Sequence, residues 1–187
     1  MHTTVTIEKK KKYTVEDYDK LPEGAPYQLI KGGLVMTPSP IPYHQEIILK
    51  LGSKLLKFID KNRLGKVYIA PIDVYFSDTD VYQPDIIFIS KMHLKIIGEK
   101  RIDGAPDIVI EVLSPSSAYY DLRLKKDVYE QSGVTEYWII DPVQKKIEMF
   151  FNKQDRFELI TSSDNGGSVS STVLKGFTIS LQEIFGE

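Results

Sequence analysis

Carboxylates stand in two segments that otherwise have the composition of buried strands. QPDIIFIS, residues 83–90, carries Asp85, and PDIVIEVLS, residues 106–114, carries Asp107 and Glu111. The other residues of both segments are mostly apolar and β-branched, as in strands covered on both faces. An ionised carboxylate in such a strand costs free energy unless a metal, a cation or hydrogen bonds receive it. Glu111, in the middle of its apolar run, therefore needs a partner.

The strand pattern brings two of these carboxylates together. If the segments pair antiparallel with Asp85 opposite Glu111, Ile87 faces Val109 and all four side chains share one face of the sheet. The α-carbons of Asp85 and Glu111 would then lie about 5 Å apart. Asp107 would lie roughly 13 Å from Glu111 along the strand, which is too far to share a small metal ion with it.

Two carboxylates this close repel each other in a low-dielectric site, and a divalent cation relieves the repulsion. Carboxylates completed by water molecules are typical of a magnesium site. We therefore expect Asp85 and Glu111 to bind magnesium (Mg2+) or manganese (Mn2+). Two plainer explanations stay open. Pro-Asp is a common turn at the start of a strand, and a buried glutamate can simply pair with a lysine.

A lysine follows on the next predicted element, a helix over residues 117–133. Asp121, Lys125 and Tyr129 are spaced by four and share one helix face. One interpretation is an exposed Asp121–Lys125 ion pair worth a few tenths of a kcal/mol. The other turns this face toward the end of the sheet, where Lys125 reaches a bound phosphate or a metal-activated water. Lys126 points about 100° away, and Tyr129 is expected to pack.

Periodicity and turn signals predict the elements that position these residues. From residue 43 the predicted order is α-β-β-β-α-β and then a hairpin, formed in turn by residues 43–61, 66–77, 82–90, 106–113, 117–133, 135–141 and 146–160. Outside this core we predict a hairpin at 27–36, short helices at 13–21 and 181–185, a loop with a short helix at 91–104 and a loop at 162–171.

The order of elements predicts a mixed α/β fold, an α+β arrangement with a mixed sheet. Three successive strands without helices between them favour an antiparallel meander, and the strand that follows a helix can add to it in parallel. Helices are expected to cover the sheet because its strands are apolar on both faces.

Composition limits the classes of protein. The 187 residues suit one domain, which we place at residues 13–187 after a flexible basic tail at residues 1–12. The absence of cysteine excludes disulfides and thiolate metal sites. No apolar run is long enough to span a membrane, and no signal-peptide pattern occurs, so a cytoplasmic location is expected. The net charge of −2 does not indicate a general affinity for nucleic acid.

Taken in order, YQPDIIFIS, GAPDIVIEVLSPSS, the Asp121-Lys125-Tyr129 spacing and GVTEYWIIDP resemble the Uma-two family of restriction endonucleases, within the PD-(D/E)XK nuclease superfamily. The similarity extends over residues 13–187. It implies a restriction-endonuclease-like αβββαβ core with extra N-terminal and C-terminal hairpins. It also implies that Asp85, Glu111 and Lys125 are catalytic. Asp85 is the acid of the PD motif and Glu111 that of the (D/E)XK motif. Leu113 stands where the motif has lysine, and Lys125 supplies the missing charge.

The resemblance also points to supporting residues. The first helix of the superfamily often offers a glutamate to the site, and Glu46 is the candidate, although His44 and Gln45 share its turn. Asp107 and Asp121 are further acidic residues of the matching segments. Gln28 and Lys31 stand where similar sequences often carry Glu and Asp. Ser114, Ser116 and Ser117 are expected either to cap the following helix or to bind phosphate.

Together these features predict a metal-dependent endonuclease that hydrolyses phosphodiester bonds in DNA, acting as a homodimer. The alternative is a non-catalytic module for binding or dimerisation that keeps the nuclease fold. A metal-dependent enzyme acting on another phosphate ester is a third possibility.

Overall fold

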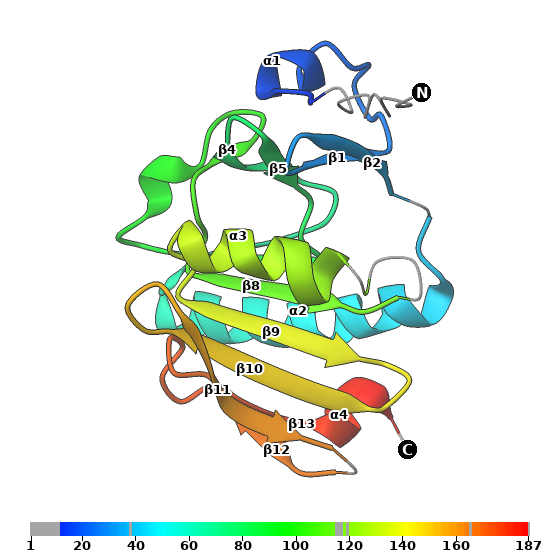
Figure 1. The fold of residues 1–187 in the computed structure, drawn as a ribbon. Helices are drawn as coiled ribbons and strands as arrows, with labels where there is room; N and C mark the ends of the chain where they lie inside the picture. The colour runs from blue at the N-terminus through cyan, green and yellow to red at the C-terminus, as the bar shows by residue number, and fades with distance from the viewer. Residues whose placement is uncertain (1–11, 38, 115–117, 119, 165, 187) are drawn as a thin grey trace, which may run out of the picture.

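The computed structural model describes residues 12–186 except 38, 115–117, 119 and 165. Its centre is a six-stranded mixed sheet in the order β11-β10-β9-β8-β6-β3 (Figure 1). The strands are β3 (Gly65–Ile69), β6 (Ile86–Ser90), β8 (Ile108–Val112), β9 (Glu136–Asp141), β10 (Lys146–Asn152) and β11 (Phe157–Ser163). β8 and β9 are parallel and the other neighbours antiparallel. The predicted mixed fold and the parallel fourth strand are confirmed.

Helices cover both faces of this sheet, because both faces are apolar. On one face lies α2 (Pro42–Asn62), which buries Ile47, Leu51, Leu55 and Ile59 against the sheet. On the other face lies a π-helical segment (Tyr120–Lys125) that continues into α3 (Lys126–Gln131). The final helix, α4 (Leu181–Phe185), packs beside α2.

A second sheet, in the order β2-β1-β5-β4-β7, corrects the prediction of one strand over 66–77. Its strands are β1 (Tyr27–Ile30), β2 (Gly33–Met36), β4 (Val74–Ser77), β5 (Asp80–Tyr82) and β7 (Ile102–Asp103). Residues 66–77 divide between β3 and β4, which belong to different sheets. Pro71 lies at the division and has no N–H for a strand ladder. The predicted loop at 91–104 contains a 3₁₀ turn (Leu94–Ile96) as well as β7.

The terminal elements follow the prediction more closely. α1 (Val15–Tyr18) begins after Thr14, whose backbone N–H donates to the Asp17 carboxylate at 3.2 Å. The predicted loop at 162–171 is partly wrong, since β12 (Ser168–Ser170) pairs there with β13 (Thr178–Ser180).

No helix within the described part of the chain is long and apolar enough to cross a membrane. The predicted tail lies outside the described residues apart from Lys12, and the domain limits stay a prediction.

Glu136, at the start of β9, ties the C-terminal segment to the central sheet. Its side chain is fully buried. One carboxylate oxygen accepts from Trp138 Nε1 at 2.6 Å and Ser171 Oγ at 2.7 Å. The other accepts from the Thr172 backbone N–H at 2.8 Å, the Thr172 hydroxyl and the Val173 N–H. Both carboxylate oxygens of Glu136 therefore accept hydrogen bonds from neutral donors only.

Replacing this acceptor tests how far the C-terminal segment depends on it. Glu136→Gln turns an amide NH2 toward donors, and we expect the free energy of unfolding to fall by about 2–4 kcal/mol. Urea unfolding measures the change. The matched control is Glu158→Gln in the exposed Lys153–Glu158 pair, which should cost no more than about 0.5 kcal/mol. Equal effects of the two substitutions would contradict the role given to Glu136.

Candidate active site

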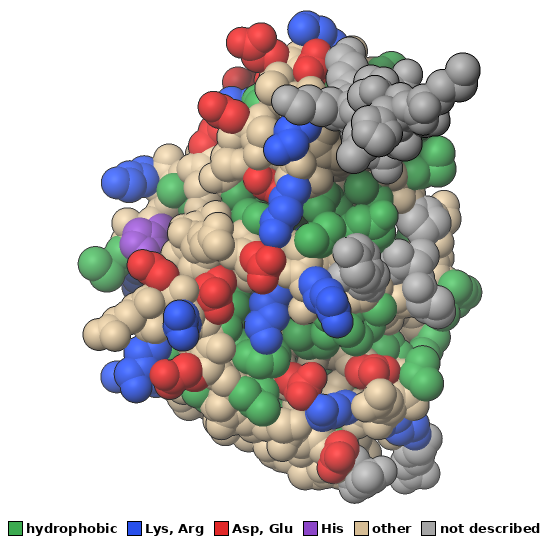
Figure 2. Space-filling view, in the orientation of Figure 1, with side chains coloured by type: hydrophobic (Ala, Val, Ile, Leu, Met, Phe, Trp, Pro, Cys, Tyr) green, Lys and Arg blue, Asp and Glu red, His purple; other side chains and the backbone are tan. Residues whose placement is uncertain are grey.

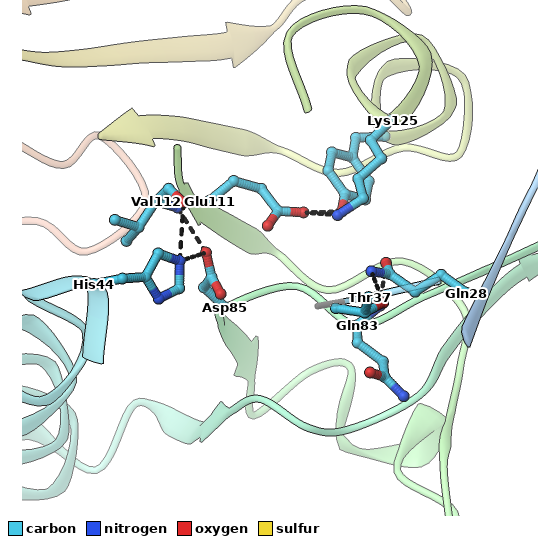
Figure 3. A network of polar contacts seen from close by, with 9 residues as sticks. Gln28, Thr37, His44, Gln83, Asp85, Glu111, Val112 and Lys125 are labelled. Atoms are coloured by element: carbon cyan, nitrogen blue, oxygen red, sulfur yellow. Dashed lines mark hydrogen bonds and ion pairs between the residues drawn. The ribbon is translucent and has the colours of Figure 1, made fainter. Parts of the chain in front are cut away.

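Asp85 and Glu111 meet at one end of β6 and β8 (Figure 3). The strands pair with Ile86 opposite Ile110 and Ile87 opposite Val109, which is the predicted register, and Asp85 immediately precedes β6 at the end where Glu111 lies. The Asp85 Oδ2 atom accepts a hydrogen bond from the backbone N–H of Val112 at 2.7 Å. This bond fixes the carboxylate beside the last residues of β8.

His44, in the first turn of α2, is the first-helix residue that reaches this place. Its Nε2 atom lies 3.0 Å from the carbonyl oxygen of Val112 and 3.3 Å from Asp85 Oδ2. Because both partners only accept, Nε2 carries the proton. Glu46 instead pairs with Lys50 at 2.6 Å on the outer side of the helix, and Gln45 is exposed. The structure therefore brings His44 to the site and leaves the other two residues away from it.

Glu111 is received by two side chains from the helix that follows β8. Its Oε1 atom accepts from Lys125 Nζ at 3.0 Å and from the Tyr129 hydroxyl at 2.6 Å. Glu111 is 2% exposed and Lys125 3% exposed. Lys125 is too buried to form the exposed ion pair with Asp121 that helical spacing alone allowed. The side chain of Asp121 lies outside the described residues. Lys125 ends the π-helical segment, a kind of bulge frequent at functional sites.

Aromatic rings enclose the Glu111–Lys125 pair. The ammonium of Lys125 lies 6.0 Å from the centre of the Tyr82 ring, and the Tyr82 and Tyr129 rings contact edge to face. Burial and a hydrogen bond to Asp80 raise the pKa of Tyr82, so its hydroxyl stays neutral. A low-dielectric wall of this kind strengthens the attraction between the paired charges.

Sequence reasoning assigned Tyr129 to packing and missed its hydrogen bond to Glu111. The signal was present, because a spacing of four places Tyr129 on the helix face of Lys125. It also missed a polar wall across from Lys125, formed where Gln28 donates to Thr37 Oγ1 at 3.0 Å and accepts from the Gln83 N–H at 2.9 Å (Figure 3). These contacts join strands that only the tertiary structure brings together.

The other predicted residues lie elsewhere. Asp107 is at the opposite end of β8, where it accepts from the Ser90 N–H at 2.7 Å and pairs with His93 Nδ1 at 2.9 Å. It is separated from Glu111, as the strand spacing predicts. Lys31 pairs with Asp127 at 3.0 Å and links the β1–β2 turn to α3. Ser116 and Ser117 lie outside the described residues.

The carboxylate oxygens of Asp85 and Glu111 are ligands of the kind that a hard divalent cation such as magnesium binds. Magnesium takes oxygen ligands and is commonly bound by one or two carboxylates, with water and substrate phosphates completing its shell. Within the described residues, no three His, Cys, Asp or Glu side chains gather into a complete metal site. An ion held by Asp85 and Glu111 would therefore keep positions for water and a phosphate oxygen.

Comparisons with known proteins identify a family and agree with the fold. The model of the Uma2 family, described as "Putative restriction endonuclease", matches residues 15–182. The chain is also similar to a crystal structure from Anabaena variabilis described as "a putative nuclease belonging to DUF820". The TM-score is 0.76 at 21% identity, over 92% of this chain and 97% of the other. At that identity the likeness concerns the fold. No curated protein matches the sequence.

The burial of the Glu111–Lys125 pair predicts strong coupling between the two residues. Lys125→Met should lower the free energy of unfolding by about 3–5 kcal/mol, because Glu111 keeps its buried charge and loses its cation. Adding Glu111→Gln should recover part of that loss, giving a non-additivity of about 1–3 kcal/mol in a double-mutant cycle.

Denaturant unfolding of the single and double variants measures this coupling. The exposed Glu46–Lys50 pair, changed in the same way, is the control and should show a coupling of only about 0.2–0.5 kcal/mol. Additive effects at Glu111 and Lys125 would mean that the pair is not buried as described.

Proposed function

The chain belongs to the Uma2 family, and from this membership we propose that it is a metal-dependent endonuclease that hydrolyses phosphodiester bonds in DNA. The observation that carries the proposal is the meeting of Asp85, Glu111 and Lys125 at one end of the central sheet. The resemblance assigns catalytic roles to these three residues, and they come from three separate elements. A purely structural ion pair would not require Asp85 beside it.

Asp85 and Glu111 would hold a magnesium or manganese ion. When bound, such an ion polarises a phosphate and lowers the pKa of its water. His44 and the Val112 N–H hold the Asp85 carboxylate in place. The Tyr129 hydroxyl orients Glu111. Lys125 brings a positive charge to the carboxylates, where it would orient the attacking water or neutralise charge that develops on the phosphoryl oxygens.

One observation favours the alternative, a non-catalytic module with a nuclease fold. Glu111 Oε1 already accepts from Lys125 and Tyr129, so its charge is compensated within the protein. The face in Figure 2 adds nothing in favour of DNA, because basic and acidic side chains interleave there around apolar ones and the described side chains form no single basic surface. Cleavage and metal binding distinguish the two functions.

DNA cleavage tests the assignment of catalytic residues. We expect wild-type protein to cut DNA with magnesium or manganese and to lose this activity in EDTA. Lys125→Ala and Glu111→Ala should each reduce the rate by at least about 10²-fold, the scale of losing one group that stabilises a transition state. Lys126→Ala is the matched control, since Lys126 lies over the Phe150 ring, and should change the rate only a few-fold. Metal-dependent activity that survives both site substitutions would refute this assignment.

Metal binding without DNA tests the two carboxylates alone. Calorimetric titration with manganese should show binding to wild-type protein that Asp85→Asn weakens by about tenfold or more, because one of the two anionic ligands is lost. Asp107→Asn, at the far end of β8, should leave the titration unchanged. If wild-type protein binds no manganese, the non-catalytic module becomes the better description.

The assembly and location are proposed with the same function. A homodimer would place two such sites on the two strands of a duplex, and a cytoplasmic protein would meet DNA there. Sedimentation velocity should give twice the mass of a 21.3 kDa chain. A single species at the mass of one chain would contradict the dimer and leave the site unaffected.

A further inference from the structure

A cavity borders Gln83, one of the residues of the polar wall that faces Lys125. It has a volume of about 640 Å³, within the roughly 300–1,000 Å³ typical of small-molecule sites. Its walls come from α1 and the segment after it, from β4, and from the loop at 99–101. The residues that matter chemically are Tyr18, Asp73, Tyr75, Gln83 and Arg101. Gln83 also belongs to the polar wall across from Lys125, and the other four residues lie outside the carboxylate site.

Four acidic residues line this cavity, and Asp73 is the one that bonds the Tyr18 and Gln83 side chains. Its Oδ1 atom accepts from the Tyr18 hydroxyl at 3.0 Å and from Gln83 Nε2 at 2.8 Å. Its Oδ2 atom has no hydrogen-bond partner among the described residues. Burial raises the pKa of Tyr18, and that of Tyr75 to about 12, so both phenols stay neutral and protonated. The carboxylate is therefore held at one oxygen, and the other can accept from a ligand.

Arg101 provides a planar surface in the same cavity. Its guanidinium lies 4.1 Å from the centre of the Tyr75 ring and pairs with Asp103 at 2.8 Å and Asp19 at 3.5 Å. These contacts hold the guanidinium in one orientation. Guanidinium planes stack on nucleobases, so the group suits a flat ligand. Asp19 is engaged by Arg101 and by the Tyr75 hydroxyl, whereas Asp73 Oδ2 is available to accept from a ligand.

The cavity is connected by hydrogen bonds to the polar wall across from Lys125, and by the chain to Asp85. Asp73 bonds the side chain of Gln83, and the Gln83 N–H bonds Gln28, which forms the wall across from Lys125. Only Pro84 separates Gln83 from Asp85, so their α-carbons are at most about 7 Å apart. A few nucleotides, at about 3.4 Å per stacked base, would cover both places.

We propose that this cavity receives an unstacked nucleobase with an exocyclic amino group (adenine, cytosine or guanine, but not thymine) from the DNA strand engaged by the carboxylate site. The inference rests on the proposed nuclease function. The amino group would donate to Asp73 Oδ2, and the ring would lie against Arg101. Thymine presents a carbonyl where the carboxylate needs a donor, and two acceptors repel. The protein would therefore discriminate adenine and cytosine from thymine near the cleavage point.

Binding of short single strands tests this inference without cleavage. Fluorescence anisotropy in EDTA compares oligo(dC), oligo(dA) and oligo(dT) of about six nucleotides. We expect wild-type protein to bind oligo(dC) and oligo(dA) about tenfold more tightly than oligo(dT), the effect of one hydrogen bond to a charged acceptor. Free deoxycytidine should compete more effectively than thymidine if the base alone is recognised. If neither nucleoside competes but the protein still prefers oligo(dC) and oligo(dA) to oligo(dT), the base is bound only as part of a strand.

An isosteric variant locates the preference. Asp73→Asn keeps an oxygen for Tyr18 and Gln83 but can turn an NH2 toward the ligand, so the preference for oligo(dC) over oligo(dT) should shrink to twofold or less, or reverse. Glu99→Gln, which removes the same charge from the rim of the cavity, should keep the wild-type preference. Equal binding of all three strands by wild-type protein overturns the inference even if Asp73→Asn does not fold.

Cleavage with manganese, measured on the same preparations, separates the two hypotheses. If the protein cuts DNA without any base preference, the proposed ligand of the cavity is wrong and the proposed nuclease function stands. A base preference that Asp73→Asn abolishes, without cleavage, supports base recognition and refutes only the proposed chemistry.

Discussion

The compensation of one buried carboxylate organises the centre of this protein. Glu111 lies within a strand that is buried on both faces, so its charge requires partners inside the fold. Lys125 and Tyr129 provide them from the next helix, which must therefore dock with that face against the sheet. The aromatic residues around this helix exclude water, which strengthens the pair and makes its loss costly.

Three buried acids on neighbouring strands are satisfied in three different ways. Glu136 is surrounded by neutral backbone, indole and hydroxyl donors, and Asp107 by a backbone N–H and a histidine. Glu111 is received by an ammonium and a phenol, beside a second carboxylate at the open end of the strands. A site saturated by fixed neutral donors holds elements together. A charged pair near Asp85 would have to exchange partners with a cation or a phosphate if the protein carries out the proposed hydrolysis.

The departure at Leu113 has a structural explanation. The backbone N–H of Leu113 donates to the Ile140 carbonyl, so this residue still extends the strand pairing, and its side chain packs in the apolar cluster on the α3 side. Lys125 instead bonds Glu111 Oε1 from the helix, so the charge reaches the site from a different position in the chain.

The local pattern of the sequence determined most strands of the central sheet, the main helices, the register of β6 with β8 and the pairing partners available to Glu111, because these depend on side-chain alternation and helical spacing over short distances. It also separated Asp107 from Glu111 by strand rise alone. The tertiary structure decided what comes together from distant segments. It selected His44 over Glu46, divided residues 66–77 between two sheets, turned Lys125 and Tyr129 onto Glu111, and built the Gln28–Gln83 wall and the cavity that borders it. Spacing along the chain cannot determine these contacts, because the direction in which a helix or hairpin docks depends on burying the apolar surface of the whole domain.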